Sequence, residues 1–314
     1  MRILSLSGGG FQDYYTALML ARFEEERGPL LDHFDLFVGT SAGAMIAAAA
    51  SVGKPMHEIC EVFRREGPKI FSDRPAPSGA VAIARDITRY VKNAKYDGKR
   101  LRAVVSALAG DRTMADSKAG ILVTAVRMRD AEPVYFSDAL TPDVLLSDAV
   151  MASSAAPMMF PAHPVNGDLY ADGALFANTP DLVALDYVTS KMGVDVSDVV
   201  MLSVGGMNLC PPLREPVTPN LGIVGWVQEN RIFRTLIGAQ AKMAENAARN
   251  VLGDRYVRVD APANFDKRNE VALDVANDAA AQAAAAAAEM TYPQIVSCLM
   301  EHLSPPTVRM GNEP

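Results

Sequence analysis

Residues 34–51 read FDLFVGTSAGAMIAAAAS, which is an apolar run, a serine between two glycines and an alanine-rich stretch. A short apolar run closed by glycine predicts a buried strand at Phe34–Val38, and alanine, the best helix former, predicts a helix at Ala44–Ser51. The turn at 39–43, GTSAG, fits GxSxG, the nucleophile elbow, where glycines stand because a Cβ would clash. That pattern alone arises by chance in roughly one chain in ten of this length, and a plain turn with Ser41 as N-cap is the alternative. The flanking strand and helix are what make Ser41 a candidate nucleophile.

A second strand, turn and helix precede this unit. Ile3–Leu6 is a short apolar run closed by GGG at 8–10, and Tyr14–Glu26 follows with apolar residues at helical spacing. Two such units in succession predict a parallel sheet with right-handed crossovers, in which the first two strands are neighbours.

The glycine loop then lies one crossover from the serine. Backbone N–H groups of Gly8, Gly9 and Gly10 can point at an anion, so they are candidates for the oxyanion hole that holds the negative oxygen formed when Ser41 attacks a carbonyl. A dinucleotide or phosphate loop is the alternative. Against it, Asp13 stands where the dinucleotide fingerprint needs a third glycine, and no GK[ST] follows.

Apolar runs continue the sheet further along the chain. They predict strands at Gly120–Arg127, Pro133–Phe136 and Val199–Val204. Clustered prolines predict an irregular loop at Gly67–Ser78, and Tyr90–Arg100 is a basic, polar connector into a helix that starts at Leu101. On these runs alone, we expect the sheet to continue to about residue 205.

Past Pro211 the sequence becomes mainly helical. We predict helices at Ile223–Leu252 and Val271–Met300, separated by a short strand at Tyr256–Val259. The alanine run in the second helix suits close helix packing. The whole is therefore predicted to be α/β, with a mainly parallel central sheet flanked by helices, a core at 1–206 and a mainly helical C-terminal part at 207–314 packed on it.

Composition excludes several classes of protein. A formal net charge of -7 gives no basic field for a phosphate backbone, so no nucleic acid polymer is expected as a partner, and any membrane contact must come from local apolar surface. Three scattered cysteines without CxxC spacing argue against a disulfide framework and a structural zinc, so a cytoplasmic location is expected. No signal peptide is visible, and the most apolar stretch, Ala42–Val52, is about half the roughly 20 residues of a membrane-spanning helix.

A serine nucleophile needs a base. None of the four histidines, His33, His57, His163 and His302, has a supporting motif, although His302 keeps the order of an α/β-hydrolase triad. The alternative is Asp172, which follows a short apolar segment and precedes a glycine turn. To act as a base near neutral pH it must be partly desolvated and held against the serine hydroxyl.

Four motifs in order resemble those of patatin-like phospholipases over roughly residues 3 to 206. They are SGGG at 7–10, GTSAG at 39–43, ASSAAP at 152–157, and DGA at 172–174 with NTP at 178–180. The resemblance implies a three-layer fold and acyl transfer by a Ser41–Asp172 dyad without histidine. It also implies an oxyanion hole at Gly8 to Gly10, no metal or organic cofactor, and a phospholipid or other acyl ester as substrate, met in transient contact with a membrane surface.

One departure from the family concerns the oxyanion loop. The family usually has Arg or Lys and then Gly after GGGx, where this chain has Gln12 and Asp13, so a charge-assisted hydrogen bond is missing there. A ligand-sensing protein of little activity on the same scaffold is therefore one alternative function, and an α/β-hydrolase esterase that uses His302 is another.

Two further stretches bear on ligands. Methionine adapts to irregular apolar ligands, so Met151, Met158, Met159 and Phe160 are candidates to line an acyl channel, with ordinary core packing as the alternative. The stretch Trp226–Arg258 is similar to bacterial members of the family that act as cyclic-nucleotide-activated effectors in anti-phage defence, which implies a cyclic nucleotide as activator.

Overall fold

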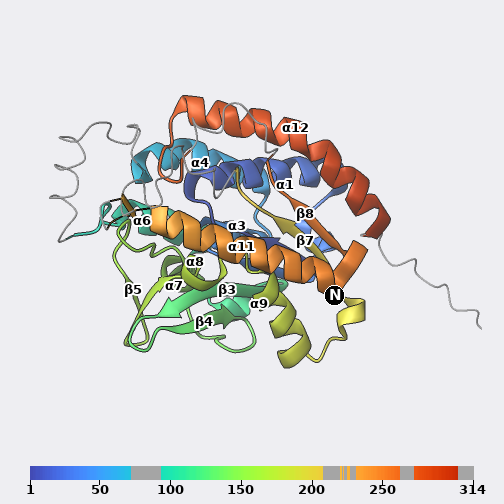
Figure 1. Ribbon diagram of the computed structural model, residues 1–314, viewed down its shortest axis with the longest axis horizontal. Coiled ribbons are helices and arrows are strands. Elements are labelled where there is room, and N and C mark those ends of the chain that lie inside the picture. The colour runs from blue at the N-terminus through green and yellow to red at the C-terminus, as the bar shows by residue number, and fades with distance from the viewer. Residues whose placement is uncertain are drawn as a thin grey trace, which may run out of the picture.

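A computed structural model describes residues 1–71, 93–207, 220, 222, 225–226, 231–261 and 272–302. Within these ranges the chain forms one eight-stranded mixed sheet (Figure 1). Its strands are β1 (Arg2–Leu6), β2 (Leu36–Gly39), β3 (Gly120–Arg127), β4 (Glu132–Ser137), β5 (His163–Val165), β6 (Asp168–Asp172), β7 (Val200–Val204) and β8 (Tyr256–Val259). The order is β5-β6-β3-β2-β1-β7-β8, with β4 also paired to β3.

The middle of this sheet is parallel, as predicted. Strands β3, β2, β1, β7 and β8 pair in parallel, and β1 and β2 are neighbours with Leu6 opposite Gly39. The antiparallel strands β4, β5 and β6 lie on the β3 side. Because the carboxyl ends of parallel neighbours share one edge, the loops after β1 and β2 meet there.

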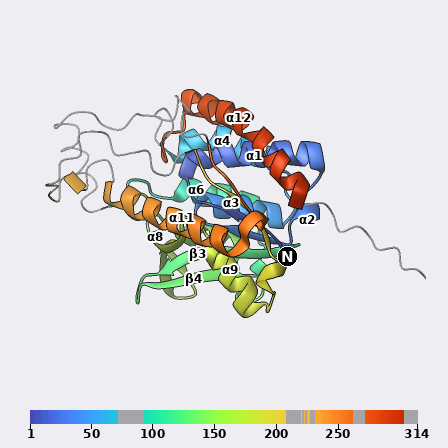
Figure 2. The same ribbon diagram turned by 45° about the vertical axis from the view of Figure 1, so that its right-hand side comes forward.

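Helices cover both faces of the sheet (Figures 1 and 2). They are α1 (Tyr14–Arg27), α2 (Leu30–His33), α3 (Ala42–Ser51), α4 (Met56–Ile70), α6 (Lys99–Ala109), α7 (Leu146–Ser153), α8 (Ala174–Ala177), α9 (Asp181–Asp186), α11 (Arg231–Leu252) and α12 (Asp278–His302). Short 3₁₀ turns occupy Gly10–Asp13, Met114–Asp116, Val196–Asp198 and Gly253–Arg255, and a π turn occupies Tyr187–Lys191.

The sheet has a hydrophobic core on each face, because successive side chains along a strand point to opposite faces. Leu4 and Leu6 pack into the larger core with α1, α3, α4 and α12, whereas Ile3 points to the opposite face, among residues of α9 and the end of α11. The chain therefore has the three-layer α/β architecture that the sequence predicts.

Helix α4 corrects one prediction. It runs to Ile70, so the loop expected from Gly67 is wrong for 67–70, and 72–78 lie outside the described residues. Pro68 sits in the last turn, where a missing N–H removes only one helical bond, and Gly67 is needed because a Cβ there would lie 2.6 Å from the Phe11 ring. Gly67 therefore stands where α4 packs closely against Phe11, the residue that follows the glycine loop.

Boundaries elsewhere shift by a few residues. Helix α6 begins at Lys99, two residues before the predicted Leu101. Helix α11 begins at Arg231, and residues 227–230 just before it lie outside the description. Helix α12 begins at Asp278, because the Asn277 side chain accepts a hydrogen bond from the Ala280 N–H at 2.8 Å and caps it.

The C-terminal part is joined to the sheet. Tyr256–Val259 is a strand, as predicted, but it pairs in parallel with β7, so the expectation that the sheet ends near residue 205 is wrong. The alanine run of α12 packs as predicted, with Ala280, Ala283 and Ala287 fully buried in the core that α12 shares with α1.

Candidate active site

Ser41 occupies a strained turn between β2 and α3. Its φ of 57° and ψ of -124° are unusual for a residue with a side chain. The flanking glycines are required, because a Cβ on Gly39 would lie 2.5 Å from the Gly43 carbonyl oxygen, and one on Gly43 would lie 2.4 Å from that of Ser7. The Ser41 N–H donates to Ser153 Oγ at 2.8 Å. The geometry is that of a nucleophile elbow, with the first turn of α3 directly behind the hydroxyl.

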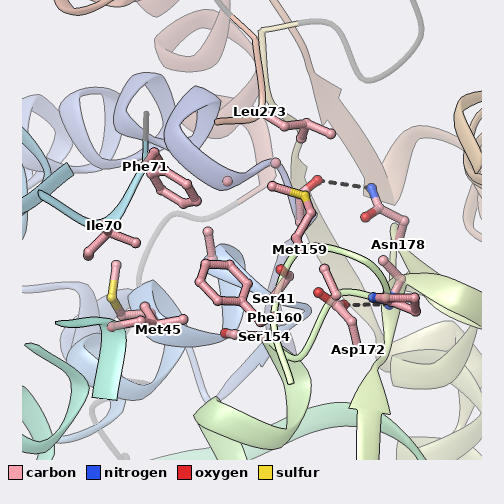
Figure 3. A pocket seen from close by; sticks show the side chains of 18 of the residues that line it. Ser41, Met45, Ile70, Phe71, Ser154, Met159, Phe160, Asp172, Asn178 and Leu273 are labelled. Atoms are coloured by element: carbon pink, nitrogen blue, oxygen red, sulfur yellow. Dashed lines mark hydrogen bonds between the residues drawn. The ribbon is translucent and has the colours of Figure 1, made fainter. Parts of the chain in front are cut away.

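Asp172 lies at the end of β6 and is only 2% exposed. Its Oδ1 accepts the Ala174 N–H at 2.8 Å, and the Ser41 side chain also interacts favourably with the ionised carboxylate. Burial raises the pKa of Asp172 to about 7, against the opposing effects of the Ala174 N–H and the Ser41 side chain. Figure 3 shows Ser41 and Asp172 at the same pocket.

Gly173 explains why the acid is followed by glycine. A Cβ at this position would lie 2.1 Å from Thr124 Oγ1 on β3. Thr124 in turn is hydrogen-bonded to Thr40, the neighbour of Ser41, at 2.7 Å. The turn after Asp172 is thus pressed against the strand that supports the serine turn.

The glycine loop reaches Ser41, as predicted. A Cβ on Gly8 would lie 2.9 Å from Ser41 Cβ. The Gly8 N–H donates to the Asn178 carbonyl at 3.0 Å, and Asn178 Nδ2 donates to the Gly8 carbonyl at 3.0 Å. Asn178 therefore fixes the loop and engages the Gly8 N–H. The prediction that all three glycines donate to an oxyanion stays a prediction, and the Gly8 N–H is already engaged by Asn178.

Asp13 is the unexpected group beside this loop. It is fully buried, and neither carboxylate oxygen makes a hydrogen bond of normal geometry within the described residues. Burial raises its pKa well above the usual range, the Gly9 N–H opposes this, and the charge of Asp172 adds to it. The cation that the family usually has near this position is replaced by Gln12, which is 5% exposed. The glycine loop therefore has a buried carboxyl group beside it, where the family usually has a cation.

A mostly apolar pocket opens at Ser41 (Figure 3). It is lined by the glycine loop, by α3, α4 and α6, by the segment before β5 and by α11. The predicted Met158, Met159 and Phe160 line it, whereas Met151 is not among its lining residues and packs in the core. One lining residue, Arg234 of α11, carries a positive charge.

A buried polar network lies behind the loop. Asp181, fully buried at the start of α9, accepts hydrogen bonds from Ser5, Ser203 and Tyr256 at 2.5 to 2.9 Å. Arg258 of β8 donates to the hydroxyls of Ser203 at 2.8 Å and of Ser7 at 3.0 Å. Ser7 directly precedes the glycine loop, so the C-terminal strand helps to hold that loop.

Histidine is absent from the described lining of the pocket. His33 contacts the Arg27 carbonyl, His57 is exposed, and His163 is buried between Asp148 and Arg102. The His302 side chain lies outside what the structure describes. No cluster of three metal-ligating side chains and no helix long and apolar enough to cross a bilayer occurs in the described part of the chain.

Sequence reasoning found Ser41, Asp172 and the glycine loop but missed four supporting residues. Ser153 and Asn178 occur in the motifs ASSAAP and NTP, but the sequence assigned no role to either residue. Arg234 and Arg258 come from the C-terminal part, where no motif marks them, so a sequence offers no signal that they approach the site.

Comparisons with known proteins concern the family and the fold of this chain. The family model described as "Patatin-like phospholipase" matches residues 4–185. A "cGAMP-activated phospholipase" of Pseudomonas aeruginosa is 31% identical over 281 residues, covering 87% of this chain and 82% of the relative. One of Vibrio cholerae is 30% identical over 309 residues, covering 88% and 86%. The solved structure of VipD from Legionella pneumophila matches with a TM-score of 0.51 at 16% identity, covering 96% of this chain and 67% of VipD, which shows the fold alone.

Proposed function

The chain belongs to the patatin-like phospholipase family and is thus a carboxylic ester hydrolase, and on that premise we propose that Ser41 and Asp172 form a catalytic dyad that hydrolyses phospholipid esters through an acyl-enzyme. The observation that carries the proposal is the buried Asp172 carboxylate. Its pKa of about 7 and its interaction with the Ser41 side chain suit a general base near neutral pH.

The first half of the reaction makes the acyl-enzyme. Asp172 takes the Ser41 proton as Oγ attacks the ester carbonyl, and the oxyanion accepts hydrogen bonds from backbone N–H groups of the loop Gly8 to Gly10. The tetrahedral intermediate collapses, the C–O bond to the lysolipid breaks, and protonated Asp172 returns the proton to the leaving alkoxide.

The second half uses water as the nucleophile. Asp172 takes a proton from water, the hydroxide attacks the acyl-enzyme, and Ser41 leaves with the proton that Asp172 held. The fatty acid is released and the enzyme returns to its starting state. The acyl chain occupies the pocket, whose walls between α4 and α6 are mostly aliphatic and aromatic side chains.

Activation by a cyclic nucleotide belongs to the same proposal. Two relatives near 30% identity that cover most of this chain are described as cGAMP-activated, and the match extends past the residues of the family model. We therefore propose that cGAMP raises the rate of hydrolysis, that the protein works in the cytoplasm, and that it serves as an effector in defence against phage.

The test is release of fatty acid from mixed bacterial phospholipids with and without cGAMP. Ser41→Ala should lower release by about 10³-fold or more in both conditions. The control is Ser106→Ala, an exposed serine on α6, which should retain full activity. Release that survives Ser41→Ala would refute the dyad, and equal release with and without cGAMP would refute the activation.

A further inference from the structure

Helix α11 has two different faces. Phe233, Arg234 and Ile237 line the pocket that contains Ser41, and Ala244 and Ala248 are buried further along the same inner side. The pocket therefore lies against the inner side of this helix. In Figures 1 and 2, α11 runs along the outside of the molecule in front of the sheet.

The outer face of α11 carries an apolar stripe. Ile232, Leu236 and Met243 are 41%, 53% and 61% exposed, and at 100° per residue their positions fall within about 40° of one another around the helix. Single exposed apolar residues need no explanation, but three aligned on one helix make a face that no described part of the chain covers.

Positive charge follows the same helix. Within Arg231–Leu252 there are four cations, Arg231, Arg234, Lys242 and Arg249, and one carboxylate, Glu245, although the chain as a whole has a net charge of -7. Glu245 is paired with both Lys242 and Arg249, at 2.9 and 3.3 Å, so cationic charge still exceeds anionic charge along α11. At 100° per residue, Arg231, Lys242 and Arg249 fall within about 20° of one another and flank the stripe on one side, about 110° around the helix from its centre.

We propose that the outer face of α11 is the surface by which the protein docks on an anionic phospholipid bilayer. An apolar stripe beside a row of cations is the pattern of a helix that lies in the plane of the membrane interface. Charge complementarity selects an anionic bilayer, and the docked helix brings the pocket lined by its other face next to the lipid. The inference rests on the proposed phospholipid substrate but concerns binding, which can be measured without hydrolysis.

Vesicle flotation of the Ser41→Ala protein tests the docking surface, because that variant leaves the lipid intact. Vesicles contain phosphatidylcholine with or without 30% phosphatidylglycerol. In this background, Leu236→Ser with Met243→Ser should weaken binding to the anionic vesicles at least about tenfold, since two apolar side chains no longer insert. A matched control is Met128→Ser with Leu140→Ser, which changes the same residue types at 52% exposure outside α11 and should bind as the parent does.

A second variant isolates the charge. Lys242→Gln should weaken binding to the anionic vesicles about fivefold at low salt and leave binding to neutral vesicles unchanged. The control for folding is the melting temperature of the Met243→Ser single variant, compared with that of the parent. Binding that is unaffected by the double change, or absent in the parent, would overturn the proposal. So would a dimer in solution that the double change dissociates, because the stripe would then be covered by a second copy.

The outcome is separable from that of the proposed function. The double variant with Ser41 intact should hydrolyse a soluble short-chain ester at the parent rate, since neither residue lines the pocket. If vesicles bind through α11 but Ser41→Ala still releases fatty acid, the dyad fails and the docking surface stands.

Discussion

Two regions of the molecule are each built around a buried carboxylate. Asp172, beside Ser41, accepts one hydrogen bond from a backbone N–H, and the Ser41 side chain interacts with its carboxylate. Asp181, behind the glycine loop, accepts from three hydroxyl groups and lies close to the Arg258 guanidinium. Both acids are almost wholly excluded from water. The difference lies in how completely their charge is satisfied.

That difference separates a reactive acid from a structural one. A buried carboxylate with few donors keeps a raised pKa and can accept a proton during a reaction. A carboxylate surrounded by donors is stabilised in its place and ties neighbouring segments together. We therefore expect changes at Asp172 to alter catalysis and changes at Asp181 to alter stability.

Asp172→Asn should show the largest effect, lowering fatty acid release by about 10³-fold or more because the base is removed. Asp168→Asn, at the other end of β6 and paired with Arg129, is the control and should stay active. An Asp172→Asn protein that retains more than a tenth of the activity would contradict the assignment of Asp172 as the reactive acid.

The same variant should also be more stable at alkaline pH. The folded pKa of Asp172, about 7, lies above its ordinary value of 3.8. Its favourable contribution to stability is thus present below about pH 4 and is lost as pH rises through 7. At pH 8, Asp172→Asn should be about 2–4 kcal/mol more stable than the parent, and the difference should vanish near pH 4. Chemical denaturation at the two pH values measures this.

Asp181→Asn should mainly lower stability and have little effect on catalysis. Three hydroxyl groups lose a charged acceptor and Arg258 loses a nearby counter-charge, so unfolding free energy should fall by about 3 kcal/mol. Activity per folded molecule should stay within about tenfold. Asp186→Asn, exposed on the same helix, should change stability by less than about 0.5 kcal/mol. A fully stable Asp181→Asn protein would show that the network is not structural.

The smallest predicted effect concerns strain at Ser41. Glycine tolerates a φ of 57° and alanine does not, so Ser41→Gly should be about 1 kcal/mol more stable than Ser41→Ala. At Ser106, within the α6 helix, the order should reverse, because glycine weakens a helix by about 1 kcal/mol. Equal stability of the two Ser41 variants would mean that the elbow stores no strain.

The reactive region was predictable from sequence because its constraints are local. Close approaches force glycines at 8, 39, 43 and 173, and such positions leave motifs that can be recognised. Strand order near Ser41 followed from the βαβα pattern for the same reason. Gly67 led to a wrong prediction of a loop because it is required by contact with Phe11, which is far away in sequence.

The structural region was not predictable. The network at Asp181 joins residues 5, 181, 203 and 256, which are far apart in sequence and are ordinary serines, an acid and a tyrosine. Arg234 likewise reaches the pocket only because α11 packs beside α8 and α9. Each depends on tertiary packing, for which a single sequence holds no pattern.

The central claim is that Asp172, with a pKa of about 7, activates Ser41. The rate of labelling by a fluorophosphonate probe, measured from pH 5 to 9, tests it most directly. Labelling should be confined to Ser41, should rise with pH around an apparent pKa near 7, and should lose both its speed and this pH dependence in Asp172→Asn. Labelling of Asp172→Asn at the parent rate, or of Ser41→Ala at all, would contradict the account.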